Sequence, residues 1–468
     1  MIIRAQFDSA QPSRRWLARD GWIVLLALIL ASSPLTPAAE IHVSLQGNDR
    51  NPGTAEQPLA TINQAAAIAQ AGDTVWIHAG RYQPDTEISP ANSGTAEAPI
   101  HYRPVAGAEV IIDGQLRLPR ESSRKMGVIS IENRNGIVLD GLKIINSRWA
   151  GVLVRNSTHV TIQNCSTQLT YGSGIIAALS SDIKVLRNSV RQACSDPGNP
   201  RKDTDECITL ASVDRFEIAY NTVTDRGEDS SNGGEGIDTK NACRNGTVHH
   251  NVVHDLVRLG IYIDAYSKEL SNIEVYANTV YRCRKGIVVA CEEGGTARDL
   301  RIHDNLVYDC PRAGIQLAGY LKGGPIQDVA IYQNTVTRCG FGATSPEYPE
   351  SGGLLIDARN PLNRNFIIRN NIFADNQTQI HTRDQAYLAI EHNLVHGVSP
   401  VRGTKAIEAD PRFVDPVGND FRLSPDSPAI DAALGEPRSL VDHTGHARPA
   451  AADLGAFEWR PATPSGRP

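Results

Sequence analysis

One short pattern occurs three times in the middle of the sequence, and it decides the fold. It reads Gly-Glu-Gly-Ile-Asp-Thr-Lys at residues 234–240, Gly-Ile-Tyr-Ile-Asp-Ala-Tyr at 260–266 and Gly-Ile-Val-Val-Ala-Cys-Glu-Glu at 286–293. Apolar residues follow each glycine at alternate positions, as in a β-strand with one buried face. The shared register of the copies indicates neighbouring strands of one parallel sheet.

The same pattern continues on both sides and is joined by a second one. Copies of the first register begin at Gly151, Gly174, Cys207, Gly236, Gly260, Gly286, Gly314 and Gly353. The second register begins at Asn188, Asn221, Asn251, Asn278, Asn305, Asn334 and Asn371. Each repeat holds about three short β-segments and leaves no space for a helix between them. This pattern predicts an all-β fold, a single-stranded parallel β-helix, over residues 98–382.

Asparagines and cysteines recur at fixed places in the repeat. An asparagine at the same turn of every coil can hydrogen-bond the backbone of the next coil, which predicts an asparagine ladder. Cys283, Cys310 and Cys339 share one offset from their asparagines and are expected to stack in the interior. Cys194 and Cys207 flank a polar insertion, and we expect a disulfide to close it, since an exported protein permits such bonds.

The first 39 residues are predicted to be a signal peptide. Arg14, Arg15 and Arg19 form a basic region, residues 21–31 are apolar, and small residues precede Glu40. The sequence leaves Sec and twin-arginine export open. We expect the mature protein to be secreted or periplasmic, without stable membrane insertion after the signal is removed.

The remaining segments flank the β-helix. Residues 40–97 form an N-terminal module, in which an alanine-rich helix at 63–71 and a strand at 74–78 are expected to cap the solenoid. Residues 383–459 form a proline-rich module that is expected to cap its other end. The tail at 460–468 has the composition of a disordered segment.

Charge and repeat length indicate the class of partner. The 468 residues carry a net charge of −6 without a basic stripe, which argues against nucleic-acid binding. Extra residues at 195–206, 225–235 and 340–352 all lie between the two registers, so their loops would project from one edge and form a cleft. We expect the protein to be a monomer.

The N-terminal module carries a family resemblance. Gly47-Asn-Asp, Pro58-Leu-Ala-Thr-Ile, Ala71-Gly-Asp-Thr-Val and Ala79-Gly-Arg-Tyr resemble the first motif of exported right-handed β-helix proteins of the pectate-lyase-like superfamily. They are most similar to proteins grouped with polysaccharide lyase family nine. The resemblance implies a right-handed β-helix and a carbohydrate-active protein that binds a polysaccharide or oligosaccharide in the cleft beside the loops. The superfamily also contains hydrolases, epimerases and non-catalytic binders.

The resemblance is partial at the site itself. The family has an acidic run that holds calcium, and residues 234–238 match it at Glu235 and Asp238 but lack its first acid. With Asp264 from the next coil, these carboxylates form a candidate calcium site, since calcium favours several oxygen ligands. The family's lysine base would fall at Tyr262 or Val288, so this chain departs from the pattern there.

Charged residues gather on two adjacent coils. Alternation places Asp238 and Lys240 on the outer face, beside Tyr262 and Asp264 of the next coil at about 4.8 Å between strands. Glu292 lies at the rim of the third coil. These five residues are the catalytic candidates. Nearby residues that we expect to bind substrate are Tyr266, Glu293 and Tyr320.

Three functions compete for this arrangement. In β-elimination on a uronate-containing glycan, Tyr262 or Lys240 would be the base. In glycoside hydrolysis, Asp238 and Asp264, or an aspartate with Glu292, would form the carboxyl pair, and Lys240 would hold Asp264 ionised. The third alternative is a carbohydrate-binding β-helix without catalysis. The family resemblance favours the lyase.

Overall fold

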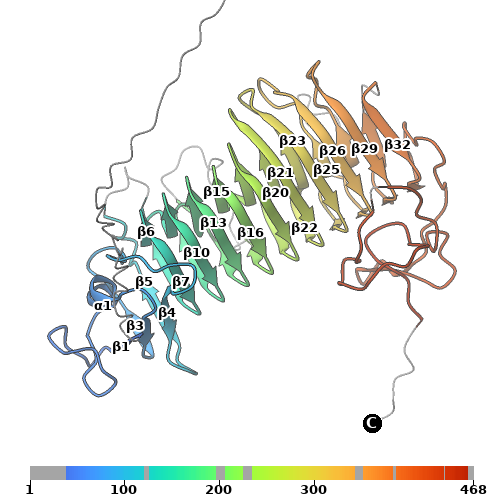
Figure 1. Cartoon of the computed structure of the whole chain (residues 1–468). Helices are drawn as coiled ribbons and strands as arrows, with labels where there is room; N and C mark the ends of the chain where they lie inside the picture. The colour runs from blue at the N-terminus through green and yellow to red at the C-terminus, as the bar shows by residue number, and fades with distance from the viewer. Residues whose placement is uncertain are drawn as a thin grey trace, which may run out of the picture. The chain divides into compact units, whose positions relative to one another are not determined.

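The computed structural model describes residues 38–120, 126–196, 206–224, 234–342, 351–382, 386–436 and 438–461, which belong to one compact unit. Strands stacked in parallel columns build most of it (Figure 1). The predicted signal peptide up to residue 37, most of the three predicted loops and the tail from residue 462 lie outside the described residues. The predicted all-β fold is confirmed.

A 13-stranded sheet forms one side of the coils. Its strands, in their order across the sheet, are β1 (Glu40–Val43), β2 (Thr74–Ile77), β4 (Ile100–Pro104), β7 (Asn135–Asp140), β10 (Thr158–Gln163), β13 (Ser181–Leu186), β16 (Asp214–Ala219), β19 (Arg244–His249), β21 (Glu269–Tyr276), β23 (Thr296–His303), β26 (Ile326–Tyr332), β29 (Arg364–Arg369) and β32 (Leu388–Glu391).

A 20-stranded sheet contains two further columns of parallel strands. The first column, in the asparagine register, contains β3 (Gly80–Tyr82), β5 (Val110–Asp113), β8 (Lys143–Ser147), β11 (Ser166–Thr170), β14 (Ser189–Arg191), β17 (Thr222–Thr224), β24 (Leu306–Tyr308), β27 (Thr335–Thr337), β30 (Ile372–Ala374) and β33 (Leu394–His396). The second, in the glycine register, contains β6 (Gly127–Glu132), β9 (Ala150–Arg155), β12 (Ile175–Ala178), β15 (Glu206–Ala211), β18 (Glu235–Lys240), β25 (Ala313–Leu317), β28 (Gly352–Ile356) and β31 (Ile380–Thr382).

Two long strands join these columns. β20 (Val252–Asp264) and β22 (Thr279–Ala290) each run through both registers without a break, with a register shift between Leu256 and Leu259. The coils of the central stretch are therefore the most continuous part of the sheet. Two of the predicted catalytic residues, Tyr262 and Asp264, lie in β20, and Glu292 follows β22.

The asparagine ladder is confirmed. The Asn278 Oδ1 accepts hydrogen bonds from the Asn251 backbone N–H at 3.0 Å and from the Asn251 Nδ2 at 2.9 Å. Asn278 in turn donates to the Val248 carbonyl and to the Asn305 Oδ1. The same contacts link successive asparagines from Asn188 to Asn393. Each buried amide is thus satisfied by its own and adjacent coils, which fixes the register between them.

The cysteines follow one prediction and contradict another. Cys283, Cys310 and Cys339 are buried in the main apolar core, as predicted. The expected bond between Cys194 and Cys207 is wrong, because no disulfide forms among the described residues. Both of these side chains are buried in the same core, where a small thiol packs as an apolar group.

The N-terminal module contains the one described helix, α1 (Ile62–Ile68), which is slightly shorter than the predicted 63–71. The Thr61 side chain caps its first turn by accepting the Gln64 N–H. Ile62, Ala65 and Ala66 point into the main core, and the helix lies at the N-terminal end of the stacked strands (Figure 1).

The C-terminal segment packs against the flank of the coils. It contains a small antiparallel pair, β34 (Phe413–Asp415) and β35 (Asp420–Leu423). One apolar cluster joins it to the asparagine-register strands and contains Leu306, Tyr308, Phe421, Ala456 and Phe457. The prediction placed this segment at the end of the solenoid. Thr404 and Ile407 pair with Glu391 and Leu394 of the last strands, and the segment also contacts the flank of the coils, where the short strands carry apolar side chains on their outer faces.

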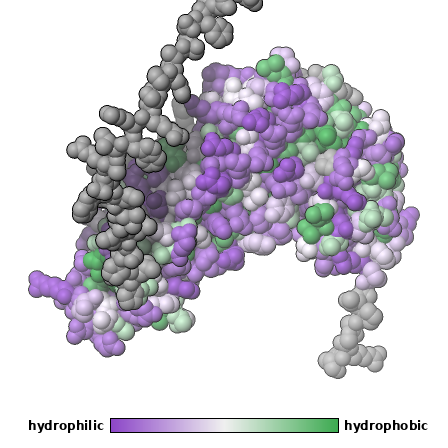
Figure 2. All heavy atoms as spheres, viewed as in Figure 1, coloured by the Kyte–Doolittle hydropathy of each residue, from purple (hydrophilic) through white to green (hydrophobic). Residues whose placement is uncertain are grey.

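The face of the molecule seen in Figure 2 is mainly hydrophilic, with apolar side chains in small separate groups. Within the part of the chain that the structure describes, no helix combines the length and apolar character needed to span a bilayer.

Candidate functional site

The glycine-register strands have two distinct faces, as the alternation predicts. Ile261 and Ile263 of β20 point into the main core. Tyr262, between them, belongs to a separate outer cluster with Val288 and Ala318. The outer face is more covered than predicted, however: Asp238 is fully buried. The site is therefore a set of buried charges on the outer face of the sheet.

The predicted neighbours are confirmed at the level of the backbone. β18 pairs with β20 so that Asp238 lies opposite Tyr262 and Lys240 opposite Asp264. The side chains do not follow this pairing. The Lys240 Nζ lies 2.8 Å from the Asp238 Oδ2 and forms a second ion pair with Glu206. The predicted Lys240–Asp264 ion pair is wrong, because a flexible ammonium settles where the negative charge is densest.

Three buried carboxylates form the acidic part of the site. Glu206, Glu235 and Asp238 each place an oxygen within 4.8 Å of the others. Arg258 donates to the Glu235 Oε1 through its Nη2 at 2.6 Å and its Nε at 3.2 Å. Two cations, Lys240 and Arg258, therefore contact three carboxylates.

Burial and mutual repulsion disturb the protonation of this group. Burial raises the pKa of Glu235 to about 7, although Arg258 opposes the shift. Burial also raises the pKa of Asp238 well above its usual value; Lys240 opposes this, and Glu206 and Glu235 add to it. Burial alone would lower the pKa of Lys240, but Asp238 and Glu206 raise it. The ammonium is thus held charged, which makes Lys240 unsuited to accept a proton.

The donor set fits a calcium ion. Carboxylate oxygens are the ligands that calcium prefers. Asp238 is fully buried, and neither of its oxygens makes a well-directed hydrogen bond to a described residue, despite the short ion pair with Lys240. The geometry replaces one predicted ligand: Glu206 joins Glu235 and Asp238, whereas Asp264 is not part of this group of described residues.

Asp264 occupies a separate position in the next coil. Its Oδ1 accepts the Tyr266 N–H at 2.7 Å and the Glu292 N–H at 3.4 Å. Burial raises the pKa of Asp264 to about 7, and the Glu292 carboxylate adds to the shift. The carboxyl is therefore poised to exchange a proton near neutral pH.

Tyr262 and Glu292 form a second pair on this face. The Tyr262 hydroxyl donates to the Glu292 Oε1 at 2.6 Å. Burial raises the pKa of Tyr262 well above its usual value, and the nearby Asp264 and Glu292 carboxylates add to the shift. The predicted role of Tyr262 as a base is therefore not favoured, because its hydroxyl remains protonated.

Lys285 has a lowered pKa, whereas the pKa of Lys240 is raised. Its Nζ donates to the Tyr320 hydroxyl and lies 4.7 Å from the centre of the Tyr320 ring. The Tyr320 hydroxyl donates to the Gln316 Oε1 at 3.0 Å, and the Gln316 Nε2 donates to the Asp357 Oδ1 at 2.8 Å. Burial lowers the pKa of Lys285 to about 8, although Asp357 opposes the shift. A substantial part of this amine is neutral at slightly alkaline pH.

The sequence analysis missed several of these residues. They are Glu206, Arg258, Lys285, Gln316 and Asp357. Strict alternation does not predict them, because each coil glycine, or Cys207, faces the core together with the residue that follows it, and the residue before it is therefore on the outer face. Glu206, Glu235 and Lys285 all occupy this position.

The remaining predicted residues lie at the rim. Tyr266 is exposed, Glu292 and Glu293 are partly exposed, and Glu293 pairs with Lys322. Tyr320, predicted to bind substrate, is partly buried against Lys285. Tyr266 and Glu293 therefore remain accessible to a ligand, while Tyr320 shapes the surroundings of Lys285.

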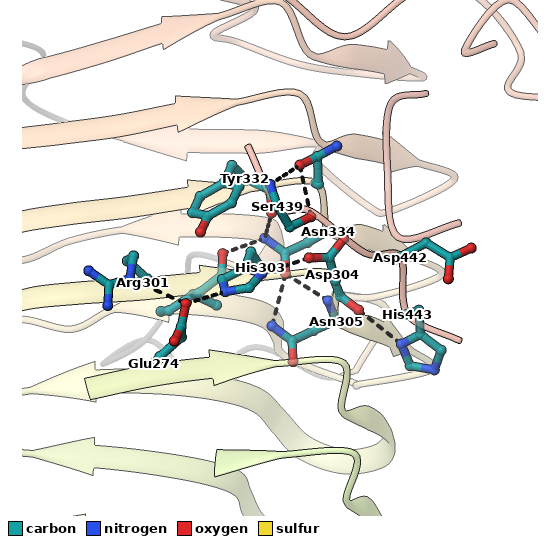
Figure 3. A network of polar contacts seen from close by, with 12 residues as sticks. Glu274, Arg301, His303, Asp304, Asn305, Tyr332, Asn334, Ser439, Asp442 and His443 are labelled. Carbon is teal, nitrogen blue, oxygen red and sulfur yellow. Dashed lines mark hydrogen bonds and ion pairs between the residues drawn. The ribbon is translucent and has the colours of Figure 1, made fainter. Parts of the chain in front are cut away.

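A second polar cluster lies away from this face, beside the C-terminal segment (Figure 3). Both ring nitrogens of His303 contact carboxylates: Nδ1 lies 2.6 Å from Asp304 and Nε2 2.9 Å from Glu274. Asp304 also binds Arg448, which pairs with Glu458. These buried contacts join the C-terminal segment to the coils, which indicates a structural role.

Comparison with known protein families supports the fold. Residues 41–197 match the family described as "Pel9A-like, right handed beta helix region". Residues 199–345 match the family described as "Right handed beta helix region". The coils are therefore right-handed, as the resemblance implied.

Two curated proteins are similar in sequence. The chain is 28% identical over 497 residues to the uncharacterized protein YwoF of Bacillus subtilis, covering 88% of this chain and 99% of YwoF. It is 32% identical over 149 residues to pectate lyase PEL9 of Emericella nidulans, covering 30% of this chain and 36% of PEL9.

Two solved structures share the fold. XylC, solved with xylose, superposes with a TM-score of 0.56 at 12% identity, covering 90% of this chain and 98% of XylC. Pectate lyase Pel9A superposes with a TM-score of 0.54 at 14% identity, covering 91% of this chain and 98% of Pel9A. The chain is a right-handed β-helix protein, and it is similar to the pectate-lyase-like proteins grouped with family nine of the polysaccharide lyases.

Proposed function

We propose that this β-helix protein is an exported polysaccharide lyase that cleaves a uronate-containing glycan by β-elimination. The observation that carries the proposal is Lys285, a lysine whose pKa is lowered to about 8 on the face that also holds three buried carboxylates. A base is most effective when its pKa lies near the working pH. The similarity to pectate lyase PEL9 supports the same reaction class.

In this mechanism the neutral amine of Lys285 takes the C5 proton of a uronate. The electron pair of the C5–H bond forms the C4–C5 double bond, the C4–O bond breaks, and the leaving oxygen takes a proton from water. The hydrogen bond from Lys285 to the Tyr320 hydroxyl, backed by Gln316, holds the amine in place. The base thus differs from both sequence-based candidates, Lys240 and Tyr262.

We propose that Glu206, Glu235 and Asp238 hold a calcium ion. When bound, the ion would neutralise the substrate carboxylate and make the C5 proton more acidic. Lys240 and Arg258 keep the carboxylates of this group in place through their ion pairs.

A panel of acidic and neutral polysaccharides tests the reaction class. Elimination produces an unsaturated uronide, whose absorbance should appear with wild-type protein and be lost in Lys285→Met. Chelation should reduce the rate, and added calcium should restore it. A wild-type preparation that yields no such absorbance on any acidic glycan contradicts the proposal.

Glycoside hydrolysis is the second candidate, favoured by one observation. Asp264 has a pKa raised to about 7, which suits a general acid. Its proposed partner Asp238 also has a raised pKa and is paired with Lys240, so Glu292 is the better candidate for the base. New reducing ends without unsaturated product would favour hydrolysis. Binding without either product would favour a non-catalytic carbohydrate-binding protein.

A further inference from the structure

Two consecutive histidines face one another at a turn between the two large sheets. His249 is the last residue of β19, and His250 follows it directly, just before the ladder residue Asn251. The His249 Nδ1 lies 2.9 Å from the His250 Nδ1. This turn joins the 13-stranded sheet to the asparagine-register strands, whereas the site proposed above lies on the glycine-register strands. The histidine pair is therefore separate from that site.

The surrounding side chains hold both rings in place. The His249 Nε2 lies 3.4 Å from the Glu217 Oε1. The His249 ring stacks on Tyr276 with 4.6 Å between ring centres, and the His250 ring stacks on Tyr220 with 4.8 Å between centres. His249 is buried, whereas His250 is partly exposed, so solvent reaches one side of the pair. The two Nδ1 atoms are thus brought together before any ligand binds.

Both imidazoles are neutral near pH 7, which is the form that binds metal ions. Burial lowers the pKa of His250 to about 4, and the charges of His249 and His443 lower it further. Burial also lowers the pKa of His249, although the Glu217 carboxylate opposes the shift. Two neutral rings can therefore offer nitrogen lone pairs to a cation.

The contact with Glu217 determines which nitrogen of His249 can bind a metal. A carboxylate at Nε2 favours the proton on that nitrogen and leaves the Nδ1 lone pair directed at His250. Metal-binding histidines are oriented by this kind of carboxylate contact. Without a metal, the His250 Nδ1–H donates to the His249 Nδ1. When a metal binds, the proton of His250 moves to its Nε2, and both Nδ1 atoms become ligands.

The distance between the nitrogens indicates the kind of metal. A divalent ion bound at about 2.0–2.1 Å by two nitrogens 2.9 Å apart holds them at an angle of about 90°. This angle suits neighbouring ligands in the tetragonal geometry of copper, and it is smaller than the tetrahedral angle typical of zinc. Copper also binds nitrogen ligands more tightly than nickel or zinc. Among the described residues, no third histidine, cysteine or carboxylate joins the pair, so water completes the coordination.

We infer that His249 and His250 form a binding site for divalent copper, with Glu217 as a positioning residue. The inference does not depend on the proposed lyase reaction, because the two sites share no residue. A metal that binds the folded turn and not the unfolded chain also stabilises the fold. Copper should therefore raise the thermal midpoint of unfolding of the full chain.

The test is a titration of the full chain with copper(II) chloride, followed by electron paramagnetic resonance. Wild-type protein should give a signal coupled to two imidazole nitrogens, whereas copper on the three carboxylates would show no nitrogen coupling. His250→Gln should lose this signal and the rise in thermal midpoint. Glu217→Gln should keep both ligands and weaken copper binding about tenfold in isothermal titration calorimetry.

His78→Gln is the matched control. The His78 Nε2 lies 3.2 Å from the His42 Nδ1, so the variant removes one member of a different histidine pair. Its copper signal should match that of the wild type. Wild-type protein that binds no copper, or shows no coupling to two nitrogens, overturns the inference. A signal that persists in His250→Gln, or is lost in His78→Gln, also overturns it, and zinc binding as tight as copper binding contradicts the assignment of the metal.

Discussion

The Lys240 ammonium lies 2.8 Å from the Asp238 carboxylate, although the strand pairing places Lys240 opposite Asp264. Asp238 is fully buried, so this ion pair is its main compensation for lost hydration. Breaking a buried pair by removing one partner costs about 3–5 kcal/mol, because the other charge remains buried. We expect Lys240→Met to lower the free energy of unfolding by about that amount, measured by urea denaturation at neutral pH.

Lys143→Met is the control for this prediction. Lys143 pairs with Glu109, and both side chains are half exposed. An exposed ion pair contributes little, so stability should hardly change. If Lys240→Met is as stable as Lys143→Met, the ion pair between Lys240 and Asp238 does not contribute the stability expected of a buried pair.

The pH dependence of turnover should report Lys285. Its amine accepts a proton only when neutral, and its pKa is lowered to about 8. We therefore expect kcat/KM to rise as the pH increases through about 8 and then to level off. Lys285→Arg should lose about 10²-fold or more, because a guanidinium stays protonated. The rate is followed by the absorbance of the unsaturated product; an unchanged profile in Lys285→Arg would exclude this base.

Asp264 should destabilise the fold at high pH. Its pKa is raised from 3.8 to about 7 in the folded protein, so the folded state binds the proton more tightly than the unfolded state. The contribution of Asp264 to the free energy of unfolding therefore falls as the pH rises from about 4 to 7. Asp264→Asn can keep the bond from the Tyr266 N–H and should be more stable than wild type above pH 7.

The same variant separates the two reaction classes. Under elimination by Lys285, Asp264→Asn keeps more turnover than Lys285→Arg, because Asp264 only positions the turn at Tyr266 and Glu292. Under hydrolysis, the loss of this carboxyl abolishes turnover. Asp299→Asn, on the opposite sheet, controls for the change of charge.

The fold was predictable because its rules are local and repeated. The apolar alternation after each glycine determines which side chains face the core, and an asparagine such as Asn278 recurs once per coil. Strand pairing then fixes backbone neighbours, which is why Asp238 was correctly placed beside Tyr262. These relations depend on spacing along the chain, and spacing is what a sequence displays.

The electrostatics of the site were not predictable in the same way. Lys240 is long enough to reach Glu206, a residue that the sequence analysis assigned to a loop. The lowered pKa of Lys285 depends on burial by Tyr320 from another coil and on arginines from three coils. Such properties arise from side-chain packing between coils, which the spacing of residues does not determine.

The asparagine ladder should carry measurable stability. Asn278 accepts two hydrogen bonds from Asn251 and donates to Val248 and Asn305, all in a buried position. Asn278→Ala leaves several buried backbone and amide groups without partners, each worth about 1–3 kcal/mol. We expect a loss of at least about 3 kcal/mol in urea denaturation. Asn272→Ala, at an exposed ladder position of the other sheet, should lose far less, and equal losses would contradict the structural role of the ladder.

His303 should make the attachment of the C-terminal segment depend on pH. Both of its ring nitrogens contact carboxylates, so the protonated ring can donate to Asp304 and Glu274 together. Burial alone would lower its pKa, but hydrogen bonds to Asp304 and Glu274 raise it above 6.5. The stabilisation is therefore complete below pH 6.5 and is lost as the pH rises through the raised pKa. His303→Gln should cost more stability in mildly acidic than in alkaline solution.

Two measurements distinguish this effect from a general loss of packing. The stability difference between wild type and His303→Gln is compared across pH with that for His446→Gln, which is exposed and contacts Asp442 at 3.9 Å. Limited proteolysis reports whether the segment around Arg448 is released first. A stability difference for His303→Gln that stays constant with pH would show that the ring is not held as a cation between Glu274 and Asp304.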